Sequence, residues 1–136
     1  MSYGTSAGLQ AALYGVLSAD ASLTGLIGSH VYDGVPAGEI PSAYVVIGSE
    51  DVRDRSDQTG GMDQYRVTIG VVTEADGFQR AKEIAGAVSD ALDGAVPALS
   101  RGRIINLSFE RARARRVRAG QVRRIDLIFR ILVDDT

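Results

Sequence analysis

The sequence contains no cysteine and a single histidine among its 136 residues. Without cysteine, the chain forms no disulfide bond, no thiolate nucleophile and no cysteine-ligated zinc site. His30 has no second histidine with which to share a metal ion or to pair with a nucleophile, so we expect it to have a structural or surface role.

Long apolar runs are also missing. No stretch approaches the roughly 18 apolar residues that a membrane-spanning helix requires, so we expect no membrane partner. Residues 1–8 have neither basic residues nor a sustained apolar segment, and we expect no secretory signal there.

Residues 49–63 collect carboxylates in an order that matches no familiar metal or phosphate site. Their spacing fits no calcium-binding loop, and Arg53 and Arg55 lie between them. No lysine follows Gly60 and Gly61 to complete a phosphate-binding loop. We therefore expect a long solvated loop, and we predict no metal site, no cofactor and no enzymatic activity.

Three segments have the apolar spacing of helices. We expect Ser6 to cap a first helix that ends near Ser18, and Asp20 to cap a short second one over residues 20–28. The third helix ends near Gly94, and its predicted start is a capping box formed by Asp76 and Gln79.

Strand patterns occupy residues 43–48, 64–73, 103–110 and 122–133, after a brief extended piece at residues 30–32. In the third of these strands, alternation predicts that Ile105, Leu107 and Phe109 share one face. Because consecutive strands pair antiparallel, we predict an α+β fold: a two-layer sandwich of about four antiparallel strands covered on one face by two helices. The whole chain, residues 1–136, is expected to form one domain with protruding loops at 49–63 and 111–121.

Charge is distributed unevenly along the chain. Residues 1–100 hold 13 carboxylates and five cationic side chains, whereas residues 101–136 hold ten arginines and four carboxylates. These counts give net charges of −8 and +6, which sum to the −2 of the whole chain. Opposite charges on separate surfaces of one subunit favour head-to-tail contacts, which close into rings when the rotation between neighbours permits.

The densest basic segment is residues 111–124, with seven arginines in fourteen residues. Such a segment forms a solvated hairpin, contacts nucleic acid, or contacts an acidic protein surface, since the guanidinium fork binds phosphate and carboxylate alike. The segment contains no aromatic residue for base stacking, which favours the acidic protein surface. The candidate interface residues are the arginines of the segment and four carboxylates of the acidic loop: Arg111, Arg113, Arg115, Arg116, Arg118, Arg123, Arg124, Asp51, Asp54, Asp57 and Asp63.

Most of the chain resembles the tail terminator, or tail completion, proteins of long-tailed phages and of phage-like gene transfer agents. The resemblance is one of pattern and order, without a catalytic motif. It is found in the opening helix around residues 9–17, residues 19–23 and 30–36, Pro41 with residues 44–48, the strand at 65–72, and the helix that begins after residues 76–77 and ends at 90–93.

The resemblance implies a structural α+β subunit without catalytic activity. It implies a homo-hexameric ring that caps the tail tube protein, joins the head–tail connector, and leaves an axial opening through which DNA passes without sequence-specific contact. It also implies a place in the tail of a virion or phage-like particle, with assembly in the host cytoplasm. The density of arginine in residues 111–124 departs from many relatives, so the direction in which that hairpin faces stays open.

Two other functions compete with this hypothesis. One is a small nucleic-acid-binding module that uses the arginine hairpin. The other, a distant third, is a small hydrolase that uses the carboxylates of residues 49–63.

Overall fold

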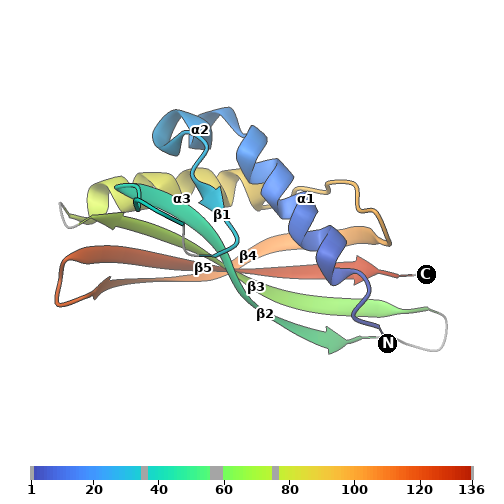
Figure 1. Cartoon of the computed structure of the whole chain (residues 1–136). Helices are drawn as coiled ribbons and strands as arrows, with labels where there is room; N and C mark the ends of the chain where they lie inside the picture. The colour runs from blue at the N-terminus through green and yellow to red at the C-terminus, as the bar shows by residue number, and fades with distance from the viewer. Residues whose placement is uncertain (1, 35–36, 56–59, 75–76, 136) are drawn as a thin grey trace.

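A five-stranded sheet with three helices on one face forms the body of the protein (Figure 1). The computed structural model describes residues 2–34, 37–55, 60–74 and 77–135. Along the chain, the elements are α1 (Ser6–Ala19), α2 (Ala21–Ile27), β1 (Val31–Tyr32), β2 (Ala43–Asp54), β3 (Met62–Glu74), α3 (Phe78–Leu92), β4 (Arg103–Val117) and β5 (Val122–Asp134).

The sheet is mixed, with the order β1-β2-β3-β5-β4. The α+β class is confirmed, and four strands pair antiparallel as predicted, but the predicted numbers of strands and helices were too low. The two-residue β1 pairs parallel with β2, through Val31 opposite Val45, and the short α2 adds a third helix to the covering layer. A strand this short leaves little periodicity in the sequence, because period-two patterns need at least four residues.

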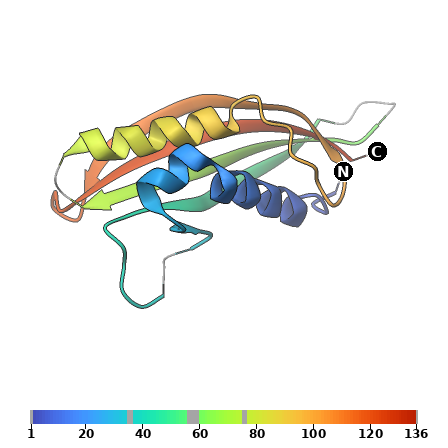
Figure 2. The same ribbon diagram turned by 90° about the horizontal axis from the view of Figure 1, so that it is seen from above.

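The core lies between the sheet and the helices. Seen from above, α1 and α3 lie over the strands of the sheet (Figure 2). α1 contributes the stripe Leu9, Leu13 and Leu17, which is fully buried as its helical spacing predicts. Alternate residues of β3 and β5 face the same layer, and they include Tyr65 and Phe129. The helices therefore cover one face of the sheet, and alternation directs the intervening side chains to the other face.

Two of the predicted helix starts differ from the structure. Thr5, rather than Ser6, is the N-cap residue of α1, and the Ser6 hydroxyl instead donates to the Glu50 carboxylate. Asp76 lies outside the described residues, and the N-cap position of α3 is Gly77 with a φ of 104°. The cap of α2 was predicted correctly, because the Asp20 carboxylate accepts a hydrogen bond from the Leu23 N–H at 2.9 Å.

The prediction of a long acidic loop at residues 49–63 was wrong at both ends of that range. β2 continues to Asp54 and β3 begins at Met62, with Glu50 opposite Val67 and Asp54 opposite Asp63. The ladder hydrogen bonds to the largely apolar β3 stabilise this polar stretch as a strand, and a register shift between Ile47 and Glu50 accommodates it. In the second predicted loop, β4 runs to Val117, and the chain turns at residues 118–121.

The prediction that Ile105, Leu107 and Phe109 share one face holds for Leu107 and Phe109, which pair with Ile131 and Phe129, but it was wrong for Ile105. Register shifts occur between Ile104 and Asn106 and between Phe109 and Arg111, and each inserts one extra residue. Ile104 and Leu107 are consequently buried, whereas Ile105 is 41% exposed. The end of α3 binds β4 between these bulges: Gly94 N–H donates to the Leu107 carbonyl, and the Asp93 carboxylate accepts from Phe109 N–H.

Candidate assembly surface

The face of the sheet opposite the helices concentrates positive charge. Strand register and contacts place nine arginines and five carboxylates there, a net charge of +4 in a chain of −2. The arginines are Arg53, Arg55, Arg66, Arg103, Arg111, Arg113, Arg115, Arg124 and Arg130, and the carboxylates are Asp51, Glu74, Glu110, Asp126 and Asp134. We call this surface the arginine face. Charge is thus separated between the two faces of the sheet as well as along the chain.

Several of these arginines are held by groups within the subunit. Asp126 accepts from Arg124 Nε at 2.9 Å and from an Arg115 Nη at 3.2 Å, so one carboxylate fixes two guanidinium groups. Arg66 binds both oxygens of Glu110 across the intervening β5. The hydrogen bond from Arg66 lowers the pKa of Glu110 below its usual range, and the bond to Glu110 raises the pKa of Arg66.

The seven predicted interface arginines fall into two groups. Arg111, Arg113, Arg116 and Arg118 have no hydrogen-bond or ion-pair partner within the described residues, and the first three lie exposed along β4. The others act within the subunit. Arg115 and Arg124 bind Asp126, and Arg123 donates to the Gly120 carbonyl and lies over the Phe78 ring on the helix side, 5.3 Å from its centroid.

The four predicted interface carboxylates also differ in where they lie. Asp51 and Asp54 are exposed on β2, and Asp57 lies outside the described residues. Asp63 is only 1% exposed and belongs to the interior of the subunit. The end of β2 and the start of β3 lie at one end of the sheet and the β4–β5 turn at the other (Figure 1). The structure therefore does not bring the acidic and basic segments together within one subunit.

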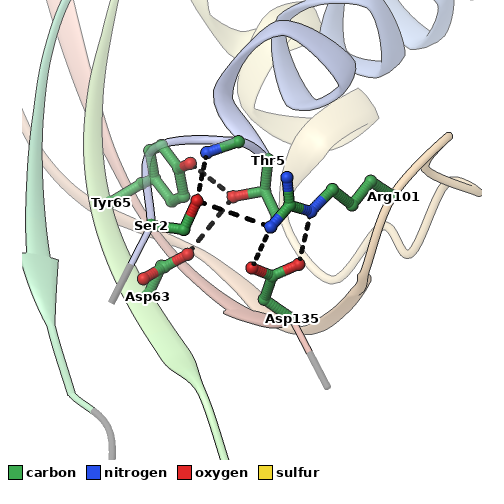
Figure 3. A network of polar contacts seen from close by, with 7 residues as sticks. Ser2, Thr5, Asp63, Tyr65, Arg101 and Asp135 are labelled. Atoms are coloured by element: carbon green, nitrogen blue, oxygen red, sulfur yellow. Dashed lines mark hydrogen bonds and ion pairs between the residues drawn. The ribbon is translucent and has the colours of Figure 1, made fainter.

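Asp63 belongs to a polar network near the two chain termini (Figure 3). Thr5 Oγ1 lies 2.6 Å from the Tyr65 hydroxyl and 3.4 Å from a carboxylate oxygen of Asp63. Beside them, Arg101 forms a two-pronged ion pair with Asp135, with both N–O distances at 2.9 Å. Burial raises the pKa of Asp63, and the negative charge of Asp135 adds to the increase. This network joins the start of α1 to β3 and to the end of β5.

Two hollows open on the arginine face and share Arg124. The first has a volume of about 420 Å³ and is surrounded by Arg111, Arg113, Arg115 and Arg124 over a floor that includes Gly48, Thr68 and Ile128. The second has about 520 Å³ and lies toward the β4–β5 turn. We call it the apolar hollow after its apolar lining residues Ile40, Pro41, Tyr44, Val72, Val117 and Val122, although Glu74, Arg118 and Arg124 line it as well. A larger groove of about 880 Å³ runs between α1 and the β1–β2 edge, where Tyr3 and Ser6 bind Glu50.

The structure gives the single histidine a local partner. Nδ1 of His30 lies 2.6 Å from the Tyr32 hydroxyl. Within the described residues, no group of three or more His, Asp or Glu side chains is placed to hold a metal ion. Among the described helices, none combines the length and apolar character needed to cross a membrane.

Comparison with known proteins identifies the family. The profile of the tail completion protein gp17 family matches residues 11–134. The chain belongs to this family. This tail completion protein is similar in structure to a chain of the "Virion of native gene transfer agent (GTA) particle", with a TM-score of 0.93 and 52% sequence identity. The match covers 98% of this chain and 99% of the other, and no curated protein matches this chain.

Sequence reasoning missed several residues of the arginine face in this tail completion protein. Arg66, Glu110 and Asp126 were not among the predicted interface residues, although they determine which arginines stay free. Gly70 was missed as well, and a Cβ there would lie 2.7 Å from an Arg124 Nη. The polar alternation of residues 64–73 and 122–133 was the signal that could have found three of the four, because it assigns Arg66, Gly70 and Asp126 to the side opposite the core.

Proposed function

We propose that this chain is the structural subunit that completes the tail of a phage-like particle. Six copies form a ring that caps the tail tube, joins it to the head connector and leaves an axial opening for DNA. The observation that supports this most strongly is the 52% identity, over nearly the full length of both chains, to a component of a native gene transfer agent virion. The role requires no catalysis and no cofactor, and it places the protein in the particle tail after assembly in the host cytoplasm.

The unpartnered arginines of β4 provide a physical basis for assembly. Closely spaced guanidinium groups repel one another unless external anionic groups neutralise them. Arg111, Arg113 and Arg116 lie on one edge strand, and Arg118 lies at its end; none of the four side chains forms a hydrogen bond or ion pair within the described residues. Carboxylates of another polypeptide would supply that charge.

Exposed acidic residues at the opposite edge of the sheet are candidate partners. Asp51 and Asp54 lie on β2, three strands away from β4, and Asp57 follows them in the sequence. A contact between unlike edges of successive subunits is heterologous, and heterologous contacts close into rings when the rotation between neighbours permits. We propose that the free arginines bind these carboxylates on the next subunit, or bind acidic residues of the tube protein. Arg115, Arg123, Arg124 and Asp63 support the surface from within the subunit.

Charge reversal tests this function. The variant with Arg113→Glu, Arg115→Glu and Arg116→Glu should remain folded but should lose the ring and its joining to tails, because the new carboxylates would repel an acidic partner. Light scattering measures the ring, and electron micrographs of particles assembled with the variant measure joining. The control is Arg80→Glu with Lys82→Glu, which reverses two exposed charges on α3. Unchanged assembly of the triple variant would refute the proposal.

A further inference from the structure

The open side of β4 has a repeating chemical pattern. Arg111, Arg113, Arg115 and Val117 occupy alternate positions and face away from the helices, since they pair with Ile128, Asp126, Arg124 and Val122. Alternate residues of a strand are separated by roughly 6.6 Å. The strand thus presents three guanidinium groups at regular intervals, followed by one apolar side chain.

The two hollows of the arginine face follow the same order along the sheet. The basic hollow contains Arg111, Arg113 and Arg115, and the apolar hollow contains Val117. Arg124 lines both hollows, so they lie next to each other. Gly70 allows the Arg124 guanidinium to lie close over the sheet, because it has no side chain at that point. Ile40 borders the apolar hollow and is 44% exposed, which leaves apolar surface available there.

The charge of the basic hollow is not balanced by the one carboxylate that lines it. Four arginines line it with one carboxylate, Asp126, and that carboxylate already accepts from two of them. The side chains of Arg111 and Arg113 form no hydrogen bond or ion pair within the described residues. A nucleic acid backbone would supply anions, but it has no aliphatic side chain for the adjoining hollow. A protein segment supplies both groups.

We propose that the two hollows bind an extended acidic segment of another protein, with carboxylates at three alternate positions and an aliphatic side chain at the fourth. An extended segment repeats its same-side residues at the interval of β4, so each carboxylate meets one guanidinium group. Arg115 donates to Asp126 through one Nη and keeps its other N–H groups for the segment. The aliphatic side chain enters the apolar hollow and fixes the register. The inference rests on the proposed function in one respect: the segment belongs to an assembly partner of the tail.

Fluorescence anisotropy with the full chain and labelled synthetic peptides tests this inference without ring formation. The first peptide alternates glutamate and serine and ends in leucine, and it is made in both directions. The second has the same composition with its three glutamates contiguous, and the third replaces leucine with serine. We expect the alternating peptide, in one direction, to bind about tenfold more tightly than either control at about 0.1 M salt.

Matched variants locate the site. Arg113→Glu should weaken binding of the alternating peptide at least about tenfold, whereas Arg116→Glu should change it less than about twofold. Both arginines are exposed and unpartnered on β4, but Arg116 faces the helix side. Ile40→Ser should weaken binding about threefold or more, whereas Ile105→Ser, at a similarly exposed isoleucine outside the hollow, should not.

Three results would overturn the inference. The first is equal affinity for the alternating and contiguous peptides, and the second is an equal loss of peptide affinity in Arg113→Glu and Arg116→Glu. The third is a duplex oligonucleotide that binds more tightly than every peptide and whose binding depends on Arg113. Arg113→Gln keeps the test valid if Arg113→Glu fails to fold, because it removes the charge without reversing it. Rings that form in a chain that binds no peptide would refute this inference alone, and peptide binding by a chain that never forms rings would refute the proposed ring alone.

Discussion

Asp63 is a carboxylate that folding removes from water. It faces Thr5 and Tyr65 and has no cationic partner among the hydrogen bonds that the structure describes. Burial therefore raises its pKa, with a smaller opposing effect from the Thr5 hydroxyl. A group whose pKa is higher in the folded state contributes stability below its unfolded pKa, about 3.9, and loses that contribution as the pH rises through the folded value.

We expect Asp63→Asn to gain stability relative to the wild type as the pH is raised from about 4 to about 7, because the amide carries no charge to bury. Urea denaturation at a series of pH values measures the difference. Glu110→Gln is the control of opposite sign, since the pKa of Glu110 is lowered in the folded state and the wild-type contribution is lost as the pH falls. Parallel pH profiles for Asp63→Asn and the wild type would contradict the burial argument.

The β4–β5 turn places three consecutive residues in the left-handed region. Arg118 has a φ of 52°, Ala119 of 54° and Gly120 of 85°. Only glycine adopts this conformation without a steric cost from Cβ, which for other residues is about 1–2 kcal/mol. Ala119→Gly should therefore raise the free energy of unfolding by about 0.5–1 kcal/mol, as measured by urea denaturation. Ala112→Gly, in the extended part of β4, should lower it, and a loss of stability in Ala119→Gly would contradict the assigned turn.

In β4, alternation alone does not predict which side chains are buried. Its two bulges interrupt the period of two, so Leu107 is buried while Ile105, two residues earlier, is exposed. Leu107→Ala should cost about 2–5 kcal/mol of unfolding free energy, because it leaves a cavity in the core. Ile105→Ala should cost less than about 1 kcal/mol. Chemical denaturation compares the two, and equal costs would mean that the bulge is misplaced.

The sequence patterns predicted the uninterrupted elements correctly. The alternation of residues 64–73 and the helical stripe of Leu9, Leu13 and Leu17 both describe surfaces that contact a single core, so burial follows directly from spacing. The bulges of β4 depend on tertiary contacts with the end of α3, through Asp93 and Gly94, and no local pattern encodes those contacts. The polar end of β2 was missed for a similar reason, since its stability as a strand comes from pairing with β3.

At the scale of the whole molecule, the assembly surface was predicted in part. The sequence identified the arginine-rich segment, and the free arginines of that segment, Arg111 and Arg113 among them, are on β4. It could not show that Arg66 binds Glu110 across β5, because that contact depends on strand order. It also could not separate free arginines from those held by Asp126.

The separation of charge between the two faces of the sheet suits a subunit that binds different neighbours on different sides. The arginine face carries +4, so the rest of the chain carries −6. Such a distribution favours one relative orientation of successive subunits over its reverse, since like faces repel. Assembly of this protein should accordingly weaken as salt screens the charges.

We propose that the free guanidinium groups of β4 are neutralised by carboxylates of neighbouring polypeptides in a ring of six subunits. A cryo-electron microscopy reconstruction of the intact particle would show whether they are. We expect six copies around the tail axis, with Arg111 and Arg113 within about 4 Å of carboxylate oxygens from an adjacent subunit or the tail tube. A reconstruction in which these side chains face solvent, or in which the chain has no rotational symmetry, would contradict it.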